Sequence, residues 1–182
     1  MPSSITNAAV HEEQRLTLLE RCRLMNTAQE RSYDLIVEGL ARLYGVPIAL
    51  ITFLDGQRQF IKANVGTDVR EMPVTESLCQ YTLESDSPLV LPDLTQDWRC
   101  HSHSLVTGDE ELRFYAGAPI IVDGYRLGTV CIFDRVPHSA NDLDASLLVH
   151  MAMMVAATIK ARSENPRAPV SYPRYRAPQN EA

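Results

Sequence analysis

The fold is decided by the stretch RFYAGAPIIVDGYRLGTVCIFDR at residues 113–135. Two β-rich apolar runs, 116–122 and 125–133, are separated only by the pair Asp123-Gly124. An Asp-Gly pair readily supplies the two positive φ angles of a two-residue type I′ turn, whose twist matches that of antiparallel strands. The stretch therefore predicts a β-hairpin.

Three other strands are predicted from the pattern of apolar residues. Residues 48–54 are apolar at nearly every position, which is typical of a strand buried on both faces of a sheet. Residues 58–66 alternate, with Lys62 and Asn64 on a solvent-facing side, and we expect this strand to pair antiparallel with its predecessor. Residues 88–91 form a short strand before a proline.

Helical spacing of apolar residues indicates four helices. An amphipathic helix is predicted at 12–25 and a short one at 75–84. A capping box at 27–30 starts another helix, which Gly45 ends. The last helix, 142–162, is apolar or small on nearly all sides. Such a helix needs a covering partner, most simply the same helix of a second subunit, so we expect a homodimer.

These elements predict one α+β domain at residues 12–162 with a central antiparallel sheet of five or six strands and helices on its faces. Residues 93–112 have no periodicity, and so long an irregular segment is more typical of a binding loop that lines a pocket. We expect residues 1–11 to be flexible. Residues 163–182 are rich in proline and arginine and are expected to be disordered.

Composition restricts the environment and the partners. The chain has 182 residues, a formal net charge of −6 and a pI near 5.3, which argues against binding to nucleic acid or to an anionic membrane. The N-terminal residues contain no secretory signal pattern, so we expect a cytoplasmic protein with four free cysteines.

Several segments, in chain order, resemble the GAF domains of bacterial sensor kinases and diguanylate cyclases. Beyond residues 113–135, the similar segments are VPIALI at 46–51, RQFIK at 58–62, SLC at 77–79, PLVLPD at 88–93 and LVTG at 105–108. The resemblance implies a profilin-like or PAS-like sheet with the terminal helices on one face and a ligand pocket on the other. In those proteins an output domain follows the last helix. Here Pro166 interrupts that helix, so we expect a stand-alone domain.

Six residues are candidates for ligand binding. By resemblance, Cys79 overlooks the pocket, although a buried cysteine is also a common core residue. Aromatic rings are suited to the walls of a cavity, with ordinary core packing as the alternative. Charged groups are suited to the polar end of a ligand. For Asp93 the alternative is a turn, and for Arg113 it is a surface ion pair. The other candidates are Asp93, Trp98, Arg113, Phe114 and Tyr115.

The sequence also contains candidate residues for metal binding and for thiol chemistry. Cys100, His101 and His103 are three metal-capable side chains within four residues, but an exposed polar loop is the alternative, because no second ligand cluster completes the site. Free methionine sulfoxide reductases are GAF-fold enzymes that use cysteines, and Cys79 with Cys100 is the pair considered for such chemistry. The sequence contains none of the common local enzyme motifs.

The favoured hypothesis is a sensory domain, not an enzyme, that binds a small cytosolic molecule and regulates signal transduction through its helical dimer interface or a partner protein. The alternatives are the thiol-dependent reductase and a dimerisation or adaptor module with no ligand. In the adaptor hypothesis the tail, which contains the P-x-x-P spacing at 166–169, would bind a partner. The sequence identifies neither the ligand nor a cofactor.

Overall fold

The central feature of the computed structural model, which describes residues 4–139 and 143–164, is the hairpin. Strand β5 (Phe114–Val122) pairs antiparallel with β6 (Tyr125–Asp134) along its whole length. The two turn residues between them have φ angles of 48° and 84°. These are the left-handed values that a type I′ turn requires, so the predicted hairpin is confirmed.

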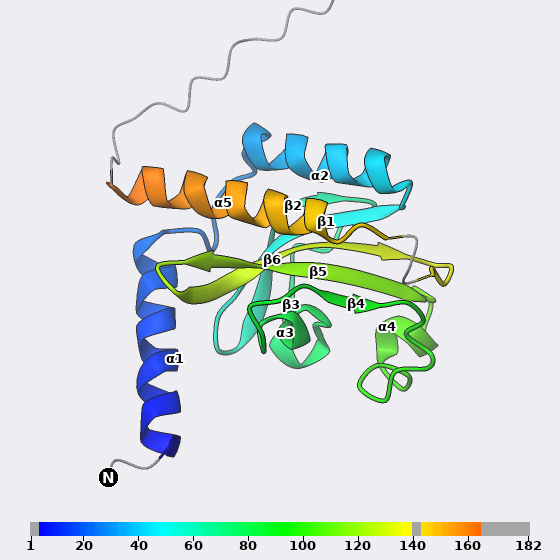
Figure 1. The fold of residues 1–182 in the computed structure, drawn as a ribbon, viewed down its shortest axis with the longest axis horizontal. Coiled ribbons are helices and arrows are strands. Elements are labelled where there is room, and N and C mark those ends of the chain that lie inside the picture. The colour runs from blue at the N-terminus through cyan, green and yellow to red at the C-terminus, as the bar shows by residue number, and fades with distance from the viewer. Residues whose placement is uncertain (1–3, 140–142, 165–182) are drawn as a thin grey trace, which may run out of the picture.

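The hairpin belongs to a six-stranded antiparallel sheet with the order β3-β2-β1-β6-β5-β4 (Figure 1). The other strands are β1 (Ile48–Leu54), β2 (Arg58–Val65), β3 (Glu71–Pro73) and β4 (Leu89–Leu91). Strand β1 is buried at every position, as predicted, because it has a neighbour on each side and a covered surface on each face. The predicted α+β class and antiparallel sheet are confirmed.

Two helices, α2 (Arg31–Tyr44) and α5 (Ser146–Glu164), cover one face of the sheet (Figure 1). Their inward side chains join those of the central strands in a single apolar cluster, in which Val37, Leu148 and Val155 have no exposed surface. Burying apolar area stabilises a fold by about 25 cal/mol per Å². The cluster on this face has more buried members than the cluster on the opposite face, so this face is the larger part of the core.

The start of α2 differs from its prediction, whereas its end agrees. The sequence predicts a capping box at 27–30. In the structure the helix begins at Arg31, and the Glu30 side chain makes no capping hydrogen bond. Glu30 instead pairs with basic side chains of β2 and α5. Gly45 ends the helix in the left-handed conformation with a φ of 66°, as expected of a glycine C-cap.

Helix α5 also begins later than predicted. Its first residue is Ser146, whose backbone N–H donates to the Asp144 carboxylate at 2.9 Å. A carboxylate at this place satisfies one of the unpaired donors of a helix start. Residues 140–142 and 165–182 lie outside the described residues, and the predicted proline-rich and arginine-rich tail falls almost wholly there.

Helix α1 (Ser4–Arg21) extends from the edge of the fold, away from the sheet (Figure 1). The predicted helix at 12–25 therefore has the wrong bounds, and the expected flexible segment 1–11 is largely helical. The Arg15 side chain holds α1 to the fold, because its Nη1 donates to the Leu54 carbonyl at 2.7 Å. None of the helices in the described ranges combines the length and apolar composition needed to cross a membrane.

The opposite face of the sheet is covered by short helices and irregular chain. The 3₁₀ helix η1 (Val74–Glu76) and helix α3 (Cys79–Thr82) replace the single helix predicted at 75–84. Helix α4 (Ser104–Thr107) interrupts the predicted irregular segment 93–112. Such short elements depend on packing against the sheet, since isolated helices of this length are unstable.

Strand β2 contains a β-bulge that the sequence pattern did not predict. The pairing with β1 shifts between Ile51 and Thr52, which leaves Lys62 as the extra residue of β2. The bulge interrupts the alternation of side chains, and Lys62 points toward the helices, where only 1% of its surface is exposed. The expectation of a solvent-facing Lys62 is therefore wrong.

Candidate functional site

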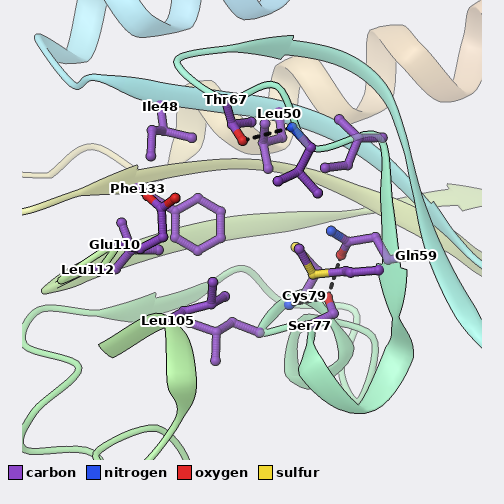
Figure 2. A pocket seen from close by; sticks show the side chains of 14 residues that line it. Ile48, Leu50, Gln59, Thr67, Ser77, Cys79, Leu105, Glu110, Leu112 and Phe133 are labelled. Carbon is purple, nitrogen blue, oxygen red and sulfur yellow. Dashed lines mark hydrogen bonds between the residues drawn. The ribbon is translucent and has the colours of Figure 1, made fainter. Parts of the chain in front are cut away.

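A small cavity lies between the sheet and the short elements that cover it on the face opposite α2 and α5 (Figure 2). Its volume is about 60 Å³. Ile48, Leu50 and Phe133 line it from the strands, and Leu105 and Leu112 line it from the segment that was predicted to border a pocket. The cavity is predominantly apolar, as ligand sites usually are.

The principal polar group of the cavity is the carboxamide of Gln59, which is 2% exposed. The Ser77 hydroxyl accepts a hydrogen bond from Cys79 N at 3.1 Å and donates to Gln59 Oε1. In this arrangement the Gln59 oxygen accepts from Ser77, and the amide NH₂ group is left to make other contacts. Figure 2 shows the amide nitrogen directed into the cavity, and no described residue accepts from it. The site therefore presents an amide donor to any molecule inside.

Two thiols lie beside this polar group. Cys79 Sγ of α3 is 3.6 Å from Cys131 Sγ of β6, and both side chains are buried. Hydrogen bonding from the Cys131 thiol and from neighbouring hydroxyls, including Thr129, outweighs burial and lowers the pKa of Cys79 to about 7. Burial raises the pKa of Cys131 well above its ordinary value. Cys79 is thus the sulfur that ionises first.

The neighbouring aromatic candidates point to opposite faces of the sheet, because successive residues of a strand alternate. Tyr115 lies on the cavity side, but its hydroxyl is hydrogen-bonded to Thr82 Oγ1 at 2.5 Å and it is buried outside the cavity lining. Burial raises the pKa of the Tyr115 phenol. Phe114 packs in the core under α2 and α5. The expectation that these two rings line the cavity is therefore corrected.

The remaining ligand candidates also lie outside the lining. Trp98 is 81% exposed. Asp93 accepts hydrogen bonds from the backbone N–H and the hydroxyl of Thr95. It therefore has the role of a turn carboxylate, which is the alternative to ligand binding. Arg113 donates to the Val106 carbonyl at 2.9 Å and so braces the chain around α4. Of the six candidates, the structure places only Cys79 in the lining.

The three metal candidates, Cys100, His101 and His103, have different environments in the structure. Cys100 is buried, which raises the pKa of its thiol to about 11, whereas His101 is exposed. His103 caps α4 by accepting from Leu105 N at 3.2 Å, and desolvation lowers the pKa of its imidazole. Among the described residues no cluster of three or more His, Cys, Asp or Glu residues could hold a metal ion. The sulfur beside Cys79 belongs to Cys131, not to Cys100.

Sequence reasoning did not single out Gln59, Ser77 or Cys131 as site residues. The signal at Gln59 was present, because it shares a strand face with Ile61 and is a polar residue at an inward position. Ser77 and Cys131 are distant in the chain from Gln59, so their meeting depends on the fold. Local spacing contains no information about it.

On the helical face, the side chain of Lys62 forms a buried charged group. Its Nζ lies 2.7 Å from the Glu30 carboxylate and donates to Thr27 Oγ1 at 2.6 Å and to the Ala28 carbonyl at 2.7 Å. Arg162 near the end of α5 reaches the same carboxylate at 2.6 Å. Glu30 therefore connects the bulge of β2, the start of α2 and the end of α5.

The family comparison agrees with the fold. The GAF domain family matches residues 29–159. A cyclic di-GMP phosphodiesterase of Pseudomonas aeruginosa is 33% identical over 157 residues, which are 85% of this chain. The chain belongs to the GAF domain family. It spans 27% of the length of that phosphodiesterase.

Solved structures share the fold at low sequence identity. The GAF domain of a phosphoenolpyruvate-protein phosphotransferase from Coxiella burnetii superposes with a TM-score of 0.63 at 19% identity, covering 85% of this chain and 98% of that one. A free methionine-R-sulfoxide reductase from Neisseria meningitidis also gives 0.63, at 14% identity and 87% and 93% coverage. The same architecture therefore serves proteins with different activities, and function has to be argued from the site.

Proposed function

We propose that this GAF domain is a sensory module that acts by binding a small molecule, not by catalysis, and signals through its helices. The observation that carries this proposal is the cavity in which Gln59 offers an amide donor among apolar walls. An amide donor that faces a cavity favours a molecule with a hydrogen-bond acceptor, because such a bond contributes about 1 kcal/mol net.

The dimensions of the cavity define the class of ligand. A volume of about 60 Å³ suits a molecule of a few heavy atoms, since drug-sized ligands need several hundred Å³. The walls favour an apolar body, and the Gln59 amide favours one carbonyl-like or similar acceptor. A larger ligand would require the covering segment around Leu105 to move outward.

Strand β2 provides a physical connection from the cavity to the helices. Gln59 faces the ligand side, and Lys62 on the same strand faces Glu30 on the helical side. A ligand that shifts β2 would alter the contact of Glu30 with Arg162 of α5. A helix packed on a sheet is a suitable two-state element, because ligands act by favouring one packing over another.

A matched pair of molecules tests the ligand proposal. Acetone and isobutene have nearly the same shape, but only acetone has a hydrogen-bond acceptor. In ¹H–¹⁵N NMR titrations we expect both to shift signals of the cavity-lining residues and only acetone to shift the Gln59 side-chain amide. One hydrogen bond should make acetone bind about fivefold to tenfold more tightly.

The variant Gln59→Leu conserves the approximate volume and removes the donor. It should eliminate the preference for acetone and leave isobutene binding unchanged or improved. Gln57→Leu changes an exposed glutamine of the preceding turn and is the matched control. Absence of shifts at the cavity with both molecules, in a protein whose circular dichroism is native, would contradict the proposal.

A further inference from the structure

The two sulfurs at the cavity are arranged for a reaction that ligand binding does not require. Cys79 Sγ and Cys131 Sγ are 3.6 Å apart in van der Waals contact, whereas a disulfide has an S–S length of about 2.05 Å. Cys79 belongs to α3, an element of four residues that can adjust its position more easily than a long helix. Closing the remaining gap needs only a small movement of this element.

Access to the two thiols is unequal. Cys79 lines the cavity, and Cys131 lies behind it in the sheet. The cavity volume of about 60 Å³ admits a molecule of the size of hydrogen peroxide. The hydroxyls of Thr52 and Thr129, which are hydrogen-bonded to each other at 2.9 Å, help to stabilise a thiolate at Cys79. The thiolate is the nucleophilic form of cysteine.

We propose that Cys79 and Cys131 form an oxidisable dithiol, in which a hydroperoxide oxidises Cys79 and Cys131 completes a disulfide. The Cys79 thiolate attacks one peroxide oxygen, the O–O bond breaks, and the leaving oxygen takes up a proton and departs as water or an alcohol. The product is a sulfenic acid on Cys79.

Cys131 then attacks the sulfur of Cys79. The S–S bond forms, the S–O bond breaks, and the departing hydroxide leaves as water with the proton of the Cys131 thiol. In total the two thiols lose two electrons and two protons, and the peroxide is reduced. The disulfide joins α3 to β6 and withdraws the Cys79 sulfur from the cavity lining. This inference does not depend on the sensory proposal.

The test uses the full chain with Cys22→Ser and Cys100→Ser, which leaves only the proposed pair. The reduced protein is treated with hydrogen peroxide, blocked with N-ethylmaleimide and digested without reductant for mass spectrometry. We expect a loss of two hydrogens, a peptide linked through Cys79 and Cys131, and reversal by dithiothreitol. Oxidation of exposed methionines without this link would overturn the proposal.

Single replacements separate the two roles. With Cys131→Ser, dimedone should trap a sulfenic acid on Cys79, because no thiol resolves it. With Cys79→Ser, Cys131 should stay reduced in the native protein, because peroxide reaches it only through Cys79. A sulfenic acid that forms first on Cys131 would overturn the assignment. If a replacement prevents folding, the two-cysteine protein still decides whether the disulfide forms.

Discussion

At the scale of single residues, the buried charge of Lys62 is a feature with a direct effect on stability. A buried ammonium is tolerated only where acceptors replace its water. Here a carboxylate, a hydroxyl and a carbonyl do so, and the Tyr33 ring lies 5.6 Å from the nitrogen. Burial opposes ionisation of Glu30, but the hydrogen bonds from Lys62 and Arg162 outweigh it and lower the pKa of that carboxyl.

Glu30→Gln should destabilise the fold by about 2 kcal/mol at pH 7, because it leaves two cations without their carboxylate. A pKa that is lower in the folded state means that ionised Glu30 stabilises the fold above its ordinary pKa of 4.5. This stabilisation disappears as the pH falls through the folded-state pKa. Urea unfolding should therefore show the wild type and the variant converging below pH 4.5.

The matched control is Glu38→Gln, which removes the exposed ion pair with Arg31. Exposed ion pairs contribute little to stability. This variant should therefore have nearly the same free energy of unfolding as the wild type at all pH values. Equal effects of the two replacements at pH 7 would show that burial of Lys62 is not the cause. Lys62→Met should lower the free energy of unfolding less than Glu30→Gln does, because it removes the buried charge itself.

At the scale of elements, the close approach of β1 and β6 determines how the central sheet packs. Gly128 of β6 pairs with Phe53 of β1, and a Cβ atom at Gly128 would lie 1.9 Å from the Thr52 carbonyl oxygen. Backbone atoms of a central strand cannot move aside at low energy. A side chain at this position would push the two strands apart.

Gly128→Ala should lower the free energy of unfolding by about 2 kcal/mol or more. Gly39→Ala in α2 is the matched control, since nothing lies within 4 Å of its Cβ position, and alanine should stabilise that helix by about 0.5 to 1 kcal/mol. Urea titration of both variants measures the difference. A neutral Gly128→Ala would contradict the tight strand contact.

At the scale of the whole molecule, the sheet separates two differently covered faces. Helices α2 and α5 cover one face (Figure 1), and the cavity lies on the other. The two helices expose apolar side chains. The large exposed apolar residues on the described parts of these two helices are Leu35, Leu43, Met153 and Met154. Apolar residues gathered on exposed helices are typical of association surfaces. We propose that a second copy of the chain packs on this surface.

Sedimentation at tens of micromolar should give a dimer for the wild type. Met153→Lys combined with Met154→Lys should weaken association at least tenfold, because it places charges on the proposed interface. Val136→Lys replaces an exposed valine outside the helices and should leave the dimer intact. A monomeric wild type at this concentration would contradict the dimer proposal.

The parts of the fold that could be predicted have local causes. The turn at Asp123-Gly124, the helix end at Gly45 and the apolar run of β1 are each determined by a few adjacent residues. Helix starts were less predictable, because Glu30 could cap a helix or pair with Lys62. The ion pair needs two elements to meet, and helix propensity does not report on that.

By itself, the sequence determined the hairpin, the antiparallel α+β sheet and membership of the GAF domain family, since these depend on period, turn residues and motif order. Only the tertiary structure decided which residues share the cavity. It placed Phe114 on the opposite face from Cys79 and brought Cys131 to Cys79. It also buried Lys62 through one bulge. The physical reason is that strand register and chain packing, which depend on residues distant in sequence, assign each side chain to a face.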